Sequence, residues 1–373
     1  MIRRVGRRAA RPVTDAARRG AAAVRTARWL PATRLFVVGD GSGWSIDDDA
    51  LEISAVASRC GYAVEDPAWA PYSRHQAVFL PSHFSALRPR WLGSTHRLGL
   101  SYFHGRPGTA GHPEFDETLE LLQRNAARIG RVQVTHAEMH ALVVDAGVGE
   151  ERVFRIPIGI DIDRFPLVDD ALRSSARHAL GLAGDAFVVG SFQKDGVGWG
   201  DGLVAKPVKG PDVLVAALAR VHERAPELVV LLTGPARGYV RAELERRGVP
   251  YVHVRIDARA GLARAYHALD AYLVASNQEG GPKSALESLA TGVPLVSTRV
   301  GQVPELTEDG REALLADVSD VDALATHVLR VRDDAELARR LRTGGRATAE
   351  AHTYAALDGR WAELLDGFVE RQG

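Results

Sequence analysis

Short apolar runs alternate with helix-like segments through the second half of the chain, and this alternation constrains the fold more than any other feature. Clear examples of such runs are LVVLLTG (228–234), AYLVAS (271–276) and VPLVST (293–298). Strands buried on both faces of a parallel sheet have this continuous apolar character, and strands that alternate with helices predict a parallel sheet. The first half repeats the pattern, beginning with a strand predicted at 35–38. We therefore predict an α/β protein with two doubly wound sheets and ligands bound beyond the carboxyl ends of the strands.

Length and composition are typical of a globular protein with two domains. The chain has 373 residues, enough for two hydrophobic cores. Hydrophobic residues make up 46% and charged residues 25%, as in soluble proteins, and no apolar run reaches the ~18 residues that span a bilayer. The single cysteine, Cys60, excludes an internal disulfide and offers no metal cluster, so we expect a cytoplasmic protein. A polar connector at about 161–184 separates the two halves.

Positive charge is concentrated at the N-terminus. Residues 1–30 hold nine arginines and one acid, Asp15. Two interpretations stay open for this basic arm: a solvated tail, or a peripheral contact with anionic lipid at the inner face of the membrane. Nucleic acid is not an expected partner, because no aromatic platform or recognition module accompanies the charge.

Lysine is rare in this chain and its positions are clustered. Against 43 arginines there are four lysines, all between positions 194 and 283: Lys194, Lys206, Lys209 and Lys283. A lysine ammonium is a compact point charge suited to phosphate oxygens, whereas arginine is a planar fork. Chance placement on a surface is the alternative, but we infer a functional reason for at least two of the four.

The glycine turn GDGSG (39–43) follows the first predicted strand. It is similar to half of a dinucleotide-binding fingerprint, but Trp44 stands where a third glycine would be. The amides of Gly41, Ser42 and Gly43 could approach a diphosphate, and ordinary turn chemistry explains the sequence equally well. We interpret the acids at 47–49 as first-turn residues of a helix rather than as metal ligands.

A second glycine turn carries more chemistry. In NQEGGPKSALESLATGVPLVS (277–297), two glycines permit close approach of a ligand, and a helix is predicted to start near Lys283 or Ser284 with its electropositive end exposed to an anion. Glu279 can accept hydrogen bonds from adjacent sugar hydroxyls, and Glu287 from a second diol. Taken alone, Glu287 is equally consistent with an exposed helical acid. The residues of this stretch that are candidates for binding a nucleotide-sugar donor are Gly281, Pro282, Lys283, Ser284 and Glu287.

Taken together, these residues resemble the retaining nucleotide-sugar glycosyltransferases of the GT-B fold, glycosyltransferase family 4, from about residue 35 onward. The most specific element is the pair of glutamates in EGGPKSALESLATGVPLVS (279–297). Supporting matches are VTHAEMHALVVDAGVGEERVFRIPIGIDIDRF (134–165), KGPDVLVAAL (209–218) and YHALDAYLVAS (266–276). The resemblance implies two Rossmann-like domains facing a central cleft, at 31–165 and 180–351. It also implies a C-terminal helix from about 352 that crosses back to the N-terminal domain.

The resemblance also implies roles for individual residues. Glu279 would bind hydroxyls of the donor sugar, Glu287 the ribose, and Lys209 the diphosphate. The family's arginine is absent after Gly190, and Lys194 would replace it ahead of an unusually long insert at 195–208. His104, in SYFHGRPG, would face the donor sugar, with Gly41–Gly43 beneath the diphosphate. The candidate catalytic residues are His104, Lys194, Lys209 and Glu279.

The function implied is that of a retaining hexosyltransferase. It would move a hexosyl residue from a nucleoside-diphosphate sugar to a hydroxyl acceptor, such as an envelope glycan, a lipid-linked molecule or a small natural product. Lysines and a helix end would stabilise the leaving diphosphate, so neither metal nor cofactor is expected. The alternatives are a sugar phosphorylase or epimerase on the same scaffold, and a non-catalytic nucleotide-sugar binder.

Overall fold

The computed structural model describes residues 33–43, 45–256 and 260–371 and divides them into two compact units. Of the described residues, the first unit contains those up to Ile156 together with 357–371, and the second contains those from Pro157 to Ala356. The predicted basic arm at 1–30 lies outside the described residues. Among the helices of the described part, none has the length and apolar character needed to cross a bilayer.

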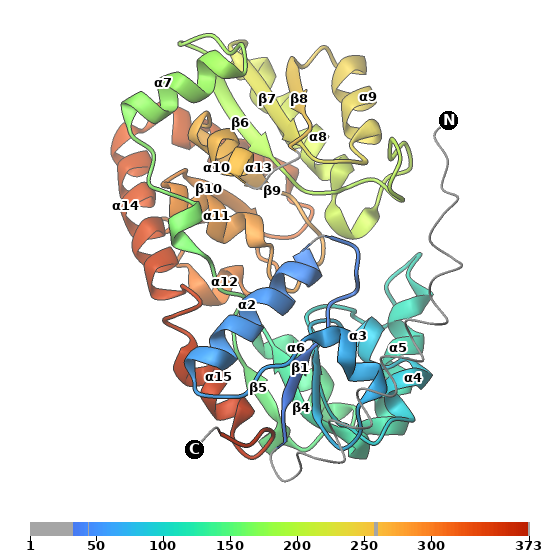
Figure 1. The fold of residues 1–373 in the computed structure, drawn as a ribbon. Coiled ribbons are helices and arrows are strands. Elements are labelled where there is room, and N and C mark those ends of the chain that lie inside the picture. Colours follow the sequence, from blue (N-terminus) through green and yellow to red (C-terminus); the bar gives the residue numbers. More distant parts are fainter. Residues whose placement is uncertain (1–32, 44, 257–259, 372–373) are drawn as a thin grey trace, which may run out of the picture. The chain divides into compact units, whose positions relative to one another are not determined.

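The first unit is built on five parallel strands in the order β1-β2-β3-β4-β5 (Figure 1). Every residue of β2 is buried, as expected of a strand covered on both faces. The elements of this unit, with η for a 3₁₀ helix, are β1 (Leu35–Val37), α2 (Ser45–Arg59), η1 (Pro67–Tyr72), β2 (Ala77–Leu80), α3 (His83–Ala86), α4 (Pro89–Leu92), β3 (Arg97–Ser101), α5 (Pro113–Asn125), η2 (Ala126–Arg128), β4 (Ile129–Val134), α6 (Ala137–Asp145), η3 (Glu150–Arg152), β5 (Val153–Arg155) and α15 (Asp358–Leu365).

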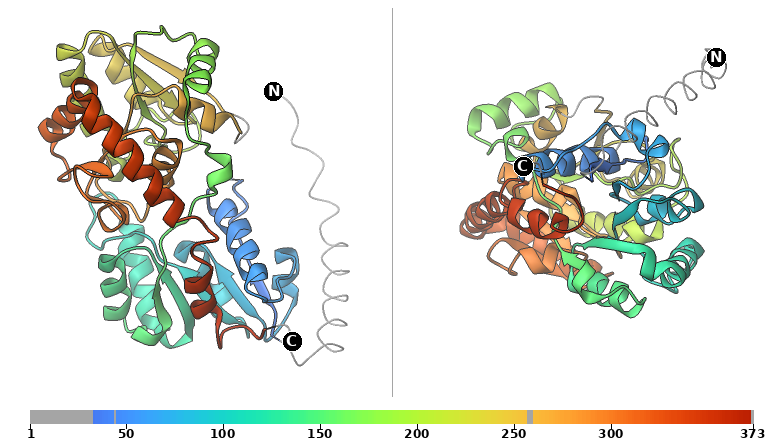
Figure 2. Two further views of the ribbon diagram at one scale, coloured as in Figure 1. Left: turned by 90° about the vertical axis from the view of Figure 1, so that its left-hand side faces the viewer. Right: turned by 60° about the horizontal axis from the view of Figure 1, so that its bottom comes forward.

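The C-terminal helix α15 belongs to this first unit, which confirms the predicted crossing back. It packs against α2, and the two helices lie side by side in Figures 1 and 2. Trp361 is 2% exposed and meets the ring of Phe79 edge-on, with 5.6 Å between ring centroids. The guanidinium of Arg59 on α2 binds the carboxylate of Asp358 through two hydrogen bonds of 3.0 and 2.6 Å.

The second unit is built on six parallel strands in the order β11-β10-β9-β6-β7-β8. The strand order reverses between β6 and β9, because the chain builds outward from β6 in one direction and then returns to build outward in the other. The elements are η4 (Ile162–Arg164), α7 (Asp170–Ala179), β6 (Phe187–Ser191), η5 (Pro207–Lys209), α8 (Pro211–Arg224), β7 (Leu228–Thr233), α9 (Gly238–Arg246), β8 (Tyr251–Val254), α10 (Ala260–His267), β9 (Ala271–Val274), α11 (Lys283–Thr291), β10 (Leu295–Thr298), α12 (Val303–Leu306), β11 (Ala313–Ala316), α13 (Val321–Asp333) and α14 (Ala335–Ala351).

Helices cover both faces of the second sheet. Val189 of β6 belongs to the core shared with α8, α9 and α13, whereas the adjacent Val188 belongs to the core shared with α7, α10 and α11. Successive strand residues point to opposite faces, so a wholly apolar strand supplies both cores. The long α14, red in Figure 2, packs along α11. The prediction of two parallel α/β sheets is confirmed, and the second sheet is doubly wound.

Two local predictions are wrong. The connector predicted at 161–184 contains a helix, α7, whose N-cap Asp169 accepts a hydrogen bond of 2.7 Å from the amide of Leu172. The preference of threonine for the N-cap position predicts that Thr135 caps the following helix, but α6 begins at Ala137 with His136 at the N-cap position. The Thr135 hydroxyl instead lies 2.9 Å from Nδ1 of His136.

Candidate donor-binding site

The predicted residues of the second unit gather where its strand order reverses. The segment after β6 carries Gln193 and Lys194, and the segment after its neighbour β9 carries Ser276 and Glu279. In open α/β sheets the crevice beyond such a switch point is the usual ligand site, because the loops from the two strands diverge there. Lys209 reaches the same place from the turn that precedes α8.

Hydrogen bonds join the Lys209 turn to the loop after β9. The amides of Asn277 and Gln278 both donate to the carbonyl of Val208, at 3.0 Å each. The side-chain amide of Asn277 donates to the carbonyl of Pro207 at 2.8 Å. These bonds connect the backbone on both sides of the site, so they set the position of the Lys209 turn relative to the glutamate loop.

Gly210 is the point of closest approach between the two segments. It adopts a left-handed conformation with φ of 57°, and a Cβ at this position would lie 2.0 Å from the carbonyl oxygen of Ala275. A side chain there would be strained twice, by its backbone conformation and by the contact. The glycine of the KG pair therefore lets Lys209 lie beside Glu279.

The carboxylate of Glu279 is held through one of its two oxygens. Oε1 accepts from Lys209 Nζ at 2.5 Å, from the Ser276 hydroxyl at 2.9 Å and from Gln193 Nε2 at 3.3 Å. Within the part of the chain that the structure describes, no donor is recorded for Oε2. Glu279 is 8% exposed, so this buried acid is oriented by three donors while its second oxygen keeps its capacity to accept hydrogen bonds.

The glycine turn after Glu279 is wedged against a neighbouring loop. A Cβ on Gly281 would lie 2.7 Å from the side chain of Gln302, which explains why glycine is needed there. The amide of Gln302 donates to the carbonyl of Gly280 at 3.0 Å, and its side chain accepts from the amide of Ile158 at 2.8 Å. Helix α11 then begins at Lys283 with Pro282 at its N-cap, so its electropositive end directly follows the turn.

Glu287 lies on α11 and is half-buried. The hydroxyl of Tyr266, on α10, donates to its Oε2 at 2.8 Å. Burial raises the pKa of the Tyr266 phenol well above 10, and the adjacent Glu287 carboxylate acts in the same direction. The tyrosine therefore stays a hydrogen-bond donor at neutral pH and orients Glu287. Its ring packs edge-on against Phe192, with centroids 4.7 Å apart.

Lys194 is placed differently from the other site residues. Its Nζ lies 3.7 Å from the centre of the Trp199 ring, a cation–π contact within the segment after β6. Burial lowers the pKa of the Lys194 ammonium. The insert at 195–208 exposes several large apolar side chains: Val197, Trp199, Leu203 and Val204.

The predicted residues of the N-terminal unit are described within that unit alone. His104 follows β3 and lies in a ring cluster, with centroid distances of 5.8 Å to His83, 5.9 Å to Phe84 and 5.6 Å to Phe115.

The GDGSG turn binds an acid of its own chain. The amides of Gly41 and Gly43 donate to the two carboxylate oxygens of Asp47 at 2.9 and 2.6 Å, and the amide of Ser42 donates to Asp40 at 3.0 Å. Asp47 lies in the first turn of α2, in agreement with its interpretation as a helix-start residue. In this structure the amides predicted to face a diphosphate are paired with carboxylates.

Four residues of the second unit were not among the predicted site residues: Gln193, Arg237, Tyr266 and Ser276. Gln193, Arg237 and Tyr266 act through contacts to neighbours that are distant in sequence, and no local pattern marks such residues. Ser276 donates to Glu279, three residues further along the chain. The described residues also contain no group of three or more His, Cys, Asp or Glu side chains arranged to hold a metal ion.

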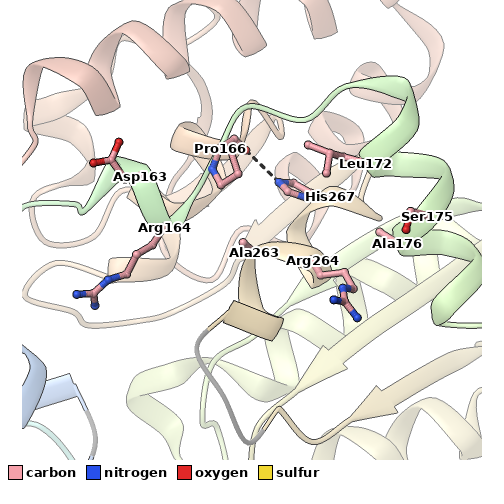
Figure 3. Close-up of a pocket in the computed structure, with 9 residues that line it drawn as sticks. All are labelled: Asp163, Arg164, Pro166, Leu172, Ser175, Ala176, Ala263, Arg264 and His267. Atoms are coloured by element: carbon pink, nitrogen blue, oxygen red, sulfur yellow. Dashed lines mark hydrogen bonds between the residues drawn. The ribbon is translucent and has the colours of Figure 1, made fainter.

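A separate pocket of about 840 Å³ lies between α10 and the segment from η4 to α7 (Figure 3). It contains none of the predicted site residues. Nε2 of His267 contacts the carbonyl of Pro166 at 3.0 Å across it. The lining residues are Asp163, Arg164, Pro166, Leu172, Ser175, Ala176, Ala263, Arg264 and His267.

Comparisons with known proteins show which proteins this chain is similar to. Residues 200–334, which include Lys209 and both glutamates, match the model of the family described as "Glycosyl transferases group 1". This segment is similar to the group 1 glycosyl transferases. The similarity to glycosyltransferases that the sequence predicts is thereby confirmed.

Relatives extend the match beyond that segment. The chain is 33% identical over 213 residues to a D-inositol 3-phosphate glycosyltransferase of Kribbella flavida, covering 54% of this chain and 47% of that protein. It is 30% identical over 251 residues to the protein of the same name from Jonesia denitrificans, covering 63% and 55%. The chain thus spans about half the length of the curated relatives that it matches.

Solved structures of the same fold cover nearly the whole chain. The Anabaena protein HepE, in complex with UDP and glucose, has a TM-score of 0.72 at 17% identity and covers 90% of this chain and 100% of that one. Sucrose-phosphate synthase from Thermosynechococcus elongatus has a TM-score of 0.72 at 17% identity, with coverage of 90% and 99%. Both support the GT-B fold predicted from the sequence.

Proposed function

We propose that this protein is a hexosyltransferase that moves a sugar from a nucleoside diphosphate to a hydroxyl acceptor with retention of anomeric configuration. One observation carries the proposal. At the switch point of the second sheet, the Lys209 ammonium and the Glu279 carboxylate lie in direct contact, and the second oxygen of the carboxylate is not used by the described part of the chain. A cation for phosphate and an acceptor for sugar hydroxyls thus lie next to each other.

The chemistry requires stabilisation of a leaving diphosphate. As the bond to the anomeric carbon breaks, negative charge develops on the phosphate oxygens, and a preorganised ammonium or helix N-terminus lowers the energy of that state. Lys209 and the start of α11 supply these charges in the proposal, and Lys194 would contribute after leaving the Trp199 ring. Since these groups offset the charge, the proposed reaction needs neither a metal nor a cofactor.

Glu279 and Glu287 would hold the two carbohydrate parts of the donor. Glu279 Oε2 would accept from hydroxyls of the transferred sugar, and the Glu287 carboxylate, oriented by Tyr266, would accept from the ribose. Gly281, Pro282, Lys283 and Ser284 would line the turn between these sites. We propose His104 and the 41–43 turn as the contribution of the N-terminal unit.

The names of similar proteins suggest the substrates to test first. HepE was solved with UDP and with UDP-glucose, and the curated relatives are named for D-inositol 3-phosphate. We propose a UDP-hexose as the first donor and a polyol phosphate as the first acceptor, with lipid-linked and glycan hydroxyls as further classes. The reaction would take place in the cytoplasm, and residues 1–30 would contact an anionic membrane.

A matched pair of lysine variants tests this function. The wild type is first screened by thermal shift with UDP-, GDP-, ADP- and dTDP-sugars, and release of the nucleoside diphosphate is then measured with the acceptor classes above. Lys209→Met is expected to lose activity about 100-fold or more, because the leaving group loses its cation. Lys206→Met, three residues away, is expected to stay near the wild type. Equal losses in both variants would contradict the assignment of Lys209, and donor binding without release would favour a non-catalytic binder.

A further inference from the structure

Arg237 is a buried arginine next to the candidate site. It lies in the turn between β7 and α9, and its side chain is 0% exposed. Nη1 donates to the carbonyl of Ser191 at 2.8 Å and also to the carbonyl of Gln193. Nη2 lies 3.0 Å from Oδ2 of Asp195, whose side chain is 2% exposed. The guanidinium therefore binds three successive points of the segment that leaves β6.

The insert at 195–208 covers this arginine. Its backbone is joined to the turn beside Arg237, because the amide of Gly238 donates to the carbonyl of Asp201 at 2.6 Å. A Cβ on Gly202 would lie 2.5 Å from the backbone of Ala236, so the insert packs against this turn without space for a side chain. The long insert thus seals the ion pair from water.

The buried pair is not explained by stability. Burial lowers the pKa of Arg237 and raises the pKa of the Asp195 carboxyl, which is the direction expected for charges removed from water. Among the described residues, neither oxygen of Asp195 has an aligned hydrogen-bond donor. Buried ion pairs of this kind are often no more stable than apolar residues of similar volume. A role in fixing the geometry of nearby groups explains better why the chain buries these two charges.

One residue links the pair to the sugar-binding carboxylate. The carbonyl of Gln193 is held by Arg237, and the side-chain amide of the same residue donates to Glu279 Oε1 at 3.3 Å and to the Ser276 hydroxyl at 3.1 Å. A shift of the Gln193 backbone would withdraw this amide from Oε1. Arg237 itself is fully enclosed, so it has no access to a substrate.

We propose that Arg237, together with Asp195, is a positioning residue for Glu279. By fixing the backbone of Gln193, it places the glutamine amide beside Lys209 on Oε1 and so keeps Oε2 directed to the donor sugar. This inference rests on the proposed function, since it assigns Oε2 to sugar hydroxyls. It predicts that Arg237 controls how well the protein distinguishes a nucleotide-sugar from the bare nucleoside diphosphate.

A charge-neutral double variant separates positioning from folding. Arg237→Met alone leaves a buried unpaired carboxylate, whereas combining it with Asp195→Leu removes both charges and is expected to fold. Its affinity for the nucleoside diphosphate should stay near the wild type, while its affinity for the nucleotide-sugar falls about 10-fold, because a carboxylate displaced by a fraction of an ångström loses its hydroxyl contacts. Arg241→Met, one turn further along α9, is the matched control and should change neither affinity.

A mutant cycle with Gln193 supplies the second readout. Gln193→Ala should give the same loss of sugar affinity as the double variant, and combining all three changes should add nothing further, because the residues act along one path. Additive losses, or full sugar affinity in the double variant, would overturn the inference. If the double variant does not fold, Arg237→Lys replaces it in the cycle: lysine keeps the charge but not the fork that binds two carbonyls, so the same loss is expected.

The outcome also separates this inference from the proposed function. A wild type that neither binds nor turns over any nucleotide-sugar would overturn both. A wild type that is active, with variants that keep the wild-type ratio of the two affinities, would overturn only the role of Arg237.

Discussion

Replacing Gly210 by alanine disturbs the contact on which the candidate site is built. A left-handed φ costs a non-glycine residue about 1 kcal/mol. In addition, the new Cβ would lie 2.0 Å from the carbonyl oxygen of Ala275, whereas real Cβ atoms stay at 3.0 Å or beyond, so the two segments must separate by at least 1 Å. Overpacking of this size adds about 1–3 kcal/mol, for a total loss of roughly 2–4 kcal/mol in the free energy of unfolding.

The same displacement separates Lys209 from Glu279. A misplacement of about 1 Å can reduce turnover about 100-fold. Urea unfolding and release of the nucleoside diphosphate would be measured together on the purified variant. Gly248→Ala is the control, because this glycine has a φ of 68° but nothing within 4 Å of its added Cβ. It should lose about 1 kcal/mol from backbone strain alone and keep its activity.

Two outcomes for the glycine variants would contradict the prediction for Gly210→Ala. Equal losses of stability would mean that the approach to Ala275 imposes no strain beyond φ. Full activity in a measurably destabilised Gly210→Ala protein would mean that the spacing of Lys209 and Glu279 does not control turnover.

Further predictions concern other parts of the chain. Burial holds the pKa of His83 well below 6.5, so the unfolded chain takes up a proton on acidification that the folded chain does not. The free energy of unfolding is therefore highest above about pH 6.5 and decreases as the pH falls. His83→Phe should therefore lose less stability than the wild type between pH 7.5 and 5.5 in urea unfolding, by up to about 1.4 kcal/mol per pH unit, and equal losses would refute this. Tyr266→Phe removes the donor to Glu287 and should raise the KM for the donor about 10-fold with little change in Tm, whereas an unchanged KM would argue against the ribose role. Trp361→Ala should lower the free energy of unfolding by about 3–5 kcal/mol, because it leaves a cavity beside Phe79. A loss below about 1 kcal/mol would mean that the C-terminal helix contributes little to the stability of the first unit.

Most of the fold was predictable because buried parallel strands are apolar throughout. Strand β2 (Ala77–Leu80) reads AVFL, and the apolar run AYLVAS contains β9. Helix α7 was missed because its sequence, DALRSSARHA, has few large apolar residues and is therefore similar to a polar connector. Thr135 satisfies the preferences of an N-cap, but the helix begins one residue later than they indicated.

The site was predictable where chemistry is local and not where it depends on tertiary contacts. Lys209 and Glu279 are distinctive because a rare lysine and a carboxylate both adjoin glycine turns, and the structure brings these two side chains together. Gln193 and Arg237 are an ordinary amide and one of 43 arginines, so only their positions in space reveal what they contact. The contact of Lys194 with Trp199 depends on the path of the insert at 195–208, which no local sequence pattern determines.

The affinities of Glu279→Gln for the nucleoside diphosphate and for the corresponding nucleotide-sugar, both by calorimetry, test the account most directly. Glutamine keeps the shape of the side chain but removes the charge that accepts sugar hydroxyls and pairs with Lys209. The account predicts that the diphosphate binds as well as to the wild type or more tightly, since Lys209 is released, while the additional affinity supplied by the sugar disappears. A variant that still prefers the nucleotide-sugar by the wild-type factor would contradict it.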